Sequence, residues 1–363
     1  MRKFLKFTHK WLSIPTGIII TVVCLTGALL VFQDEILEMV HPTHYFIKDS
    51  NKEPIPLGEL IPMVNRQLDS NSVANVTIYA ESDRTYRMGL KEGFRETAFV
   101  NQYTGEVTGF YKFRESGFYP IMCIHRWLMD DTRTWGKYAV GISTLVFIII
   151  LITGVIIWVP RKFKKAHFKV SLKNGRRRLF YDLHNVLGIY ACILLLVMSL
   201  SGLMWSFEWY RNGIFSIFGA EVAQTQGHGG GNRQGGGRTE GQEKPEMNIL
   251  QWQNILNNLK EQNEGYEYIR VQDGSASVHL KSAALSRNSD NYTFDKRSGE
   301  IVDVKLFRDQ EKTSKVWAWM YSLHVGNYWG LLSKILTFIV ALIGASLPIT
   351  GYYLFFVRKR RRT

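Results

Sequence analysis

Four stretches of this chain contain no charged side chain over 22 or 23 consecutive residues, and they limit the folds that the chain can adopt. They are Trp11 to Phe32, Tyr138 to Val159, Asn185 to Phe207 and Ile335 to Val357. A helix rises 1.5 Å per residue, so about 20 apolar residues cross a hydrocarbon core about 30 Å thick. The alternative is a soluble protein with four buried helices. Every Trp except Trp252 lies in or near the ends of these runs, as in an interfacial aromatic belt, so we predict four transmembrane helices.

The first run has an alternative interpretation as a cleaved secretory signal, because RKFLKFTHK is a plausible basic region in front of it. The run is longer than a typical signal core, lacks an obvious A-x-A cleavage site and closely matches the third run. We therefore expect it to be retained as a transmembrane helix. The three cysteines lie in or beside the apolar runs, so they indicate no disulfide framework.

The basic residues are concentrated at the ends of the apolar runs. The formal net charge of +14 would by itself also suit a nucleic-acid-binding protein. However, 18 of the 45 Lys and Arg lie in the short flanks 2–10, 161–178 and 358–362, and the remainder has 27 basic against 31 acidic residues. Lys and Arg mark the cytoplasmic side of membrane spans. We therefore expect a lipid bilayer rather than a nucleic acid as the partner, both termini and the 160–182 loop in the cytoplasm, and residues 34–137 and 208–331 outside it.

The two halves of the chain resemble each other. Residues 9–34 align without a gap on residues 184–209, so that histidine lies on histidine and Thr26-Gly27 on Ser201-Gly202. Each half continues with an exterior lobe and a second apolar run, which predicts a tandem duplication. The expected segments are the N-terminus with the first span (1–33), the first lobe (34–137), the second span (138–159), a basic loop (160–182), the third span (183–207), the second lobe (208–331) and the fourth span with a basic tail (332–363).

Each exterior lobe is predicted to be α+β, with one amphipathic helix followed by three strands. The helices are expected near 57–68 and 249–259, and the strands near 73–80, 84–91, 97–110, 266–272, 275–281 and 292–306. The sequence Asn101-Gln-Tyr-Thr-Gly105-Glu106 is echoed by Asp295-Lys-Arg-Ser-Gly299-Glu300, and a polar residue four positions before a Gly-Glu step is typical of a tight hairpin. The Gly-rich segment 227–246 lacks apolar residues for a core and is predicted to be a flexible loop.

Four of the nine histidines lie at the membrane edges in matching positions of the two halves. His9 and His184 begin the first and third helices, and His125 and His324 lie a few residues outside the second and fourth. A single histidine at such an edge is most often interfacial or hydrogen-bonded, but an imidazole near lipid is costly unless it has a partner. Four histidines in register with a duplication indicate one functional pair near each face of the membrane.

Two neutral imidazoles that face each other across a helix bundle are the axial ligands of a six-coordinate haem iron. Zinc or copper would need a third or fourth protein ligand, and no Cys, Asp or Glu recurs beside all four histidines. A proton relay would favour acids within the membrane, where the sequence has none. Cys123 lacks the first cysteine of a C-x-x-C-H motif, so covalent attachment is not expected. The sequence predicts two b-type haems, whose iron ligands are His9, His184, His125 and His324.

Each run also contains a Thr-Gly or Ser-Gly pair far from its own histidine. The glycines are Gly27, Gly154, Gly202 and Gly351. The 18 residues from His9 to Gly27 span about 27 Å of helix, so each glycine is expected to lie level with the histidine pair of the other face. We expect these glycines to leave room for a flat macrocycle, with close helix packing as a compatible alternative. Arg126 is a candidate partner for one haem propionate, and Lys10 or one of Arg176 to Arg178 for another.

On these residues the chain resembles, over its whole length, the PepSY-associated transmembrane proteins, also called iron-regulated membrane proteins. The motifs that carry the resemblance are His9-Lys-Trp-Leu, His125-Arg-Trp-Leu with Ile152-Thr-Gly-Val, Leu183-His184 with Leu187-Gly188, and Leu323-His324-Val-Gly with Trp329-Gly330 and Ile349-Thr-Gly351. The family includes periplasmic ferrisiderophore reductases of Gram-negative bacteria. The resemblance implies a bacterial inner-membrane protein with two periplasmic PepSY-like lobes and two b-type haems on the four histidines, which passes electrons to ferric siderophores.

We therefore expect a haem-dependent ferric reductase that acts on a ferric siderophore or another ferric chelate. Reduction releases the iron because Fe(II) binds hard oxygen ligands more weakly than Fe(III) does. The sequence has no Rossmann glycine motif and no P-loop, so the electron donor is expected to be a quinol or a partner reductase. Two other functions stay open: a non-catalytic, membrane-anchored PepSY binding module, and a transporter subunit, against which the lack of charge in mid-membrane argues.

Overall fold

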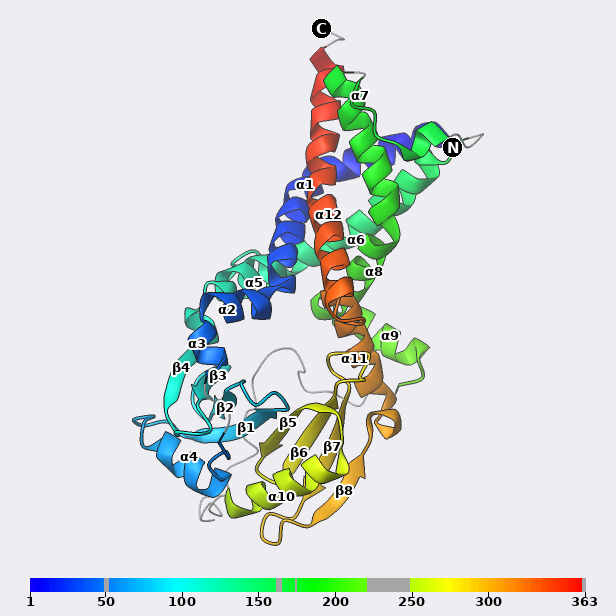
Figure 1. Ribbon diagram of the computed structural model, residues 1–363. Helices are drawn as coiled ribbons and strands as arrows, with labels where there is room; N and C mark the ends of the chain where they lie inside the picture. The colour runs from blue at the N-terminus through cyan, green and yellow to red at the C-terminus, as the bar shows by residue number, and fades with distance from the viewer. Residues whose placement is uncertain (49–51, 161–164, 174, 221–248, 361–363) are drawn as a thin grey trace. The chain divides into compact units, whose positions relative to one another are not determined.

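The computed structural model describes residues 1–48, 52–160, 165–173, 175–220 and 249–360. The predicted flexible loop at 227–246 lies outside the described residues. The chain divides into two compact units (Figure 1). Among the described residues, a helical unit contains those within 1–33, 117–220 and 316–360, and a sheet unit contains those within 34–116 and 249–315.

Four long apolar helices form the helical unit and match the four predicted spans. They are α1 (Arg2–Val31), α6 (Trp135–Trp158), α8 (Gly188–Ser206) and α12 (Leu331–Arg360). In the third span, α7 (Gly175–Asp182) continues through a π-helical turn (Leu183–Leu187) into α8, which gives one helix of 32 residues with a basic first turn and a long apolar stretch. Each span is long and apolar enough to cross a membrane. The spans begin or end a few residues outside the predicted runs because basic flanking residues continue the helices.

The four helices form a ring in which α1 contacts α6 and α12, and α8 contacts the same two helices (Figure 1). The buried side chains between them include Ile20, Phe147, Leu195 and Val340. Gly344 allows three of the helices to approach closely, because a Cβ there would come within 2.8 Å of Leu195 in α8 and 3.1 Å of Cys24 in α1. This packing fixes the relative positions of the helices that carry and support the histidines.

Two short helices outside the spans carry the other two histidines, namely α5 (Phe118–Trp127) and α11 (Lys312–Val325). The sequence analysis assigned residues 117–137, 208–220 and 316–331 to the exterior lobes, whereas they belong to the helical unit. For α5 the reason is the buried carboxylate of Asp130, which accepts hydrogen bonds from the backbone N–H groups of Thr132, Thr134 and Gly136. These bonds tie the end of α5 to the first turn of α6. A further helix, α9 (Glu208–Ile217), follows α8.

The described residues of the sheet unit form one antiparallel sheet of eight strands, in the order β4-β3-β2-β1-β5-β6-β7-β8. The strands are β1 (Val73–Tyr79), β2 (Tyr86–Leu90), β3 (Glu96–Val100), β4 (Val107–Lys112), β5 (Tyr266–Gln272), β6 (Ser275–Leu280), β7 (Ser289–Phe294) and β8 (Ile301–Lys305). The predicted count of three strands per lobe is wrong, since each third segment divides at its Gly-Glu turn into two strands. The lobes also share one sheet, because β1 pairs with β5 and places Val76 opposite Val271.

The two predicted hairpin turns are confirmed and have the same backbone structure. In the first, the N–H of Gly105 donates to the carbonyl of Asn101, and in the second the N–H of Gly299 donates to the carbonyl of Asp295, both at 2.8 Å. Both glycines have φ of +75°, a region that residues with a Cβ rarely adopt. Glycine is therefore required where β3 turns into β4 and where β7 turns into β8.

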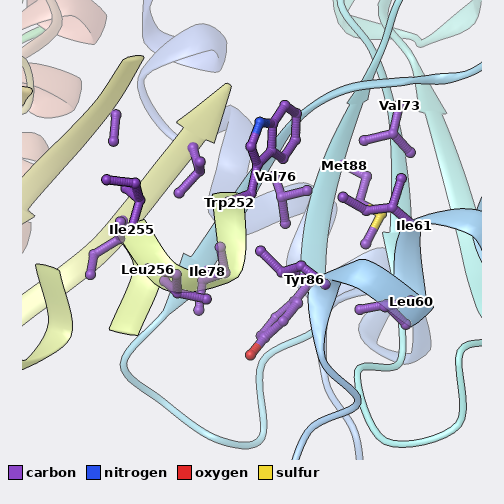
Figure 2. Packing of buried hydrophobic residues seen from close by; sticks show 14 of the residues in the cluster. Leu60, Ile61, Val73, Val76, Ile78, Tyr86, Met88, Trp252, Ile255 and Leu256 are labelled. Atoms are coloured by element: carbon purple, nitrogen blue, oxygen red, sulfur yellow. The ribbon is translucent and has the colours of Figure 1, made fainter. Parts of the chain in front are cut away.

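Two helices pack on one face of the sheet and close its core, α4 (Leu57–Asn65) and α10 (Ile249–Gln262), which also contact each other. The alternation of β1 turns Val76 and Ile78 toward them. Trp252 of α10 is only 1 % exposed and lies close to Val76 (Figure 2). This core includes residues from both halves of the chain, so neither half forms it alone. Two further helices, α2 (Gln33–Val40) and α3 (Pro42–Tyr45), connect α1 to this unit.

Candidate metal centres

The first histidine pair joins the beginning of the chain to the third span. His9 lies in α1 and His184 lies in the π-helical turn before α8. Their ring centroids are 6.3 Å apart and their planes are nearly perpendicular, at 89°. A π-helical turn inserts an extra residue into a helix and is frequent at functional sites. Here it lies at the residue that faces His9.

The second pair consists of His125 in α5 and His324 in α11. Their ring centroids are 6.1 Å apart, with an angle of 53° between the planes. The structure thus brings together the same two pairs that the sequence analysis matched. Iron binding by these pairs stays a prediction.

The spacing of both pairs suits two imidazoles that share one metal ion. Metal–imidazole bonds are about 2.0–2.1 Å long and a ring centre lies about 1.1 Å behind its nitrogen, so two imidazoles on opposite sides of one ion have centroids roughly 6.3 Å apart. Direct ring contact would not require this separation at both sites. Among the described residues, no group of three or more His, Cys, Asp or Glu side chains is placed to hold a metal. Two protein ligands suit a metal whose other ligands come from a macrocycle.

Each imidazole is held by a neighbouring helix in the same way. Its Nδ1 lies near the hydroxyl of the Ser or Thr in a Ser/Thr-Gly pair and near the carbonyl three residues before that hydroxyl. The hydroxyl residues and carbonyls are Thr153 with Ile150 for His9, Thr350 with Leu347 for His184, Thr26 with Val23 for His125, and Ser201 with Met198 for His324. A carbonyl oxygen only accepts hydrogen bonds, so Nδ1 carries the proton. Nε2 is then the nitrogen available to bind a metal.

The four glycines lie against the histidines of the other pair, level with them as the sequence analysis expected. The nearest ring atom to a Cβ built on each glycine is Cε1, of His125 for Gly27, of His324 for Gly202, of His9 for Gly154 and of His184 for Gly351. At each of these glycines the missing Cβ makes room for an imidazole ring on a neighbouring helix. Room for a flat macrocycle at the same positions stays a prediction.

The remaining predicted site residues have protein partners in the structure. The guanidinium of Arg126 lies over the ring of Trp127, 5.1 Å from its centroid, and Lys10 lies over Trp11 at 4.5 Å. Arg178 pairs with the buried carboxylate of Asp182 at 2.9 Å. Propionate binding by these residues is therefore a prediction that the contacts leave open.

The second pair lies outside the four spans, and both of its imidazoles are neutral at pH 7. Burial lowers the pKa of His125 to about 4, with smaller contributions from His324 and Arg126, and burial also lowers the pKa of His324. A neutral imidazole is the form that binds a metal ion.

Three of the other described histidines, His41, His44 and His279, have different surroundings. His41 and His44 stack on each other with centroids 5.1 Å apart and planes at 8°, and His279 stacks on Tyr268. In both stacks the ring planes are nearly parallel, whereas the planes of the two histidine pairs above meet at large angles. Neither stack therefore resembles those pairs. His279 also lies 3.5 Å from the carboxylate of Glu267.

Sequence reasoning missed two features of the site. It read the Ser and Thr of the small pairs only as small residues, although a hydroxyl one position before the glycine was a usable signal. It also missed Trp205, whose ring lies 5.2 Å from the His324 ring and 5.2 Å from Trp317. The matching residue of the first half is Leu30, so an alignment of the two halves gives no sign of it.

Four spanning helices, a separate antiparallel α+β unit and two facing histidine pairs define the class as a multi-pass α-helical membrane protein with a soluble unit. The chain belongs to the family described as PepSY-associated TM region, whose model matches residues 7–358 and hence nearly the whole sequence. No curated protein matches the chain.

Proposed function

We propose that this protein is a di-haem electron-transfer protein that reduces ferric chelates, ferric siderophores among them. The observation that supports this most is that both histidine pairs have the ring separation of two imidazoles on one metal ion, 6.3 and 6.1 Å. The proton on each Nδ1 leaves Nε2 as the donor atom, so the four histidines would hold two b-type haems, which would supply one-electron chemistry. The family membership supplies the membrane setting.

We further propose that the protein lies in a bacterial inner membrane, with both termini in the cytoplasm and the sheet unit in the periplasm. The basic flanks of the spans support this orientation. It places the His9/His184 pair toward the cytoplasm and the His125/His324 pair toward the periplasm. When bound, the two haems supply one-electron carriers near opposite faces of the membrane.

The chain's own residues prepare both sites before any cofactor binds. A main-chain carbonyl and a serine or threonine hydroxyl lie within hydrogen-bonding distance of each of the four Nδ1 atoms and orient the imidazoles. The ferric chelate is the substrate and accepts the electron on the periplasmic side. A quinol or a partner reductase is the proposed donor, since the sequence has no nucleotide-binding motif.

The test uses purified full-length protein in detergent. It is reduced with dithionite under anaerobic conditions and mixed with a ferric siderophore, while the reduced haem band and the Fe(II) formed are followed together. We expect reoxidation of the band with one Fe(II) released per electron. The Ga(III) complex of the same siderophore cannot be reduced and is the matched control.

Two outcomes would contradict the proposal. A protein with no dithionite-sensitive haem band would point to the non-catalytic PepSY module or the transporter subunit. If the reduced haem band is reoxidised by ferric chelates no faster than by the Ga(III) complex, the protein binds haem but is not a ferric reductase.

A further inference from the structure

The four hydroxyls that support the histidines differ in how close they come to Nδ1. For His184, the hydroxyl oxygen of Thr350 is the nearer acceptor, at 2.9 Å, and the carbonyl of Leu347 is at 3.1 Å. For His9, the hydroxyl of Thr153 and the carbonyl of Ile150 are both at 3.1 Å. In the His9/His184 pair, the hydroxyl oxygen is therefore as close to Nδ1 as the main-chain carbonyl oxygen, or closer.

The other pair has the opposite order. For His125, the carbonyl of Val23 lies at 2.9 Å and the hydroxyl of Thr26 at 3.3 Å. For His324, the carbonyl of Met198 lies at 2.9 Å and the hydroxyl of Ser201 at 3.3 Å. A main-chain carbonyl is the principal acceptor at both histidines, and no side-chain substitution removes it.

The cause lies in where each hydroxyl donates its own proton. Thr26, Thr153 and Ser201 lie 2.7 or 2.8 Å from the carbonyl four residues before them, which is the shorter of their two contacts. Thr350 is turned instead toward Leu347, at 2.9 Å, and lies farther from Ser346, at 3.1 Å. This turn brings its oxygen toward His184. Thr350 is 6 % exposed, so no solvent replaces its hydroxyl as an acceptor.

We infer that Thr350, with Thr153 as a weaker counterpart, is a positioning residue that sets the orientation and donor strength of the imidazoles in the His9/His184 pair. The His125/His324 pair is set by main-chain carbonyls. The inference rests on the proposed function for its reference to haem. An acceptor for Nδ1–H makes the imidazole a stronger electron donor, which favours Fe(III) and lowers the reduction potential. Only one of the two haems is therefore adjustable through a side-chain hydroxyl.

The test compares Thr350→Val, Thr153→Val, Thr26→Val and Ser201→Ala in the purified full-length protein. Potentiometric titration resolves the two haems, and their electron paramagnetic resonance (EPR) signals report ligand orientation. We expect Thr350→Val to raise the potential of one haem and to change its signal, Thr153→Val to do so less, and the other two to shift neither haem. Thr350→Ser keeps the hydroxyl and is expected to restore the wild-type values.

Thr144→Val is the matched control, because Thr144 lies in α6 and its hydroxyl donates to Val140. The inference is overturned if Thr350→Val leaves both potentials where Thr144→Val leaves them, or if Thr26→Val has the larger effect. Haem-free protein with ¹⁵N-labelled histidine gives a second readout. There, Thr350→Val is expected to move the Nδ1–H signal of His184 while Thr26→Val leaves that of His125 in place, and the reverse pattern overturns the inference even if the protein binds no haem.

Discussion

Gly27 lies directly against the imidazole of His125, so that a Cβ on Gly27 would come within 2.9 Å of Cε1. Gly202 has the same relationship with His324, also at 2.9 Å. At the His9/His184 pair, a Cβ on Gly351 would meet Cε1 of His184 at 3.6 Å, which is an ordinary van der Waals contact. The two histidine pairs therefore differ in how tightly the neighbouring helices enclose their rings.

This difference predicts opposite outcomes for two equal substitutions. We expect Gly27→Ala to push the His125 ring from its position at a cost of about 1–3 kcal/mol, as for an overpacked core. Haem at the His125/His324 pair is then lost or gives an altered spectrum. We expect Gly351→Ala to leave the spectrum of both haems unchanged. Haem content and visible spectra of the two variants check this. Equal effects of the two substitutions would show that the space between glycine and imidazole does not determine haem binding.

The angles between the imidazole planes predict that the two haems are spectroscopically distinct. A low-spin haem Fe(III) held by two nearly perpendicular imidazoles has two d orbitals close in energy and gives a signal with one large g value. We expect this signal from a haem at the His9/His184 pair, where the planes meet at 89°. The 53° angle at the His125/His324 pair separates these orbitals and gives a more rhombic signal. EPR spectra of the oxidised protein are expected to contain both signals. His184→Ala should remove the first and His324→Ala the second.

Asp130 is predicted to support the second histidine pair from a distance. Its carboxylate accepts three backbone N–H groups between α5 and α6, and its removal leaves these donors without that acceptor. Asp130→Ala is expected to loosen α5 and to weaken haem retention at His125. Asp295→Ala removes a comparable turn carboxylate in the sheet unit and is the control. Equal haem retention in the two variants would contradict this role.

In the sheet unit, Trp252 is predicted to be a main source of stability. Its side chain is 1 % exposed, and Trp→Ala substitutions in a core typically cost about 3–5 kcal/mol. We expect Trp252→Ala to speed hydrogen exchange in β1 and β5 of the full-length protein. Leu250→Ala on the same helix changes a side chain that is 70 % exposed and should leave the exchange as in the wild type. Slow exchange in both variants would show that the core tolerates the cavity.

The spans and the histidine pairing were accessible from the sequence because both depend on strong local signals. A charge-free run of 22 residues is typical of a transmembrane helix, and the alignment of the two halves matches His9 with His184. The Gly-Glu turns were equally clear, since φ of +75° at Gly105 and Gly299 requires glycine. These features can be predicted from neighbouring residues in the sequence or from the alignment of its two halves.

The features that sequence reasoning missed depend on contacts between distant segments. The pairing of β1 with β5 joins the two halves into one sheet. The alternation of apolar and polar residues within a strand does not show which other strand it pairs with. The hydrogen bond from His184 to Thr350 joins residues 166 positions apart. The small-Gly pairs were located correctly, but their role against the imidazole rings follows only from three-dimensional geometry.

The most direct test of the central claim is the number of haems per chain, measured by pyridine haemochrome assay against protein concentration. We predict two haems in the wild-type protein, one in His184→Ala, one in His324→Ala and none in the double variant. A wild-type protein that binds no haem, or a double variant that still binds two, would contradict the assignment of the two histidine pairs.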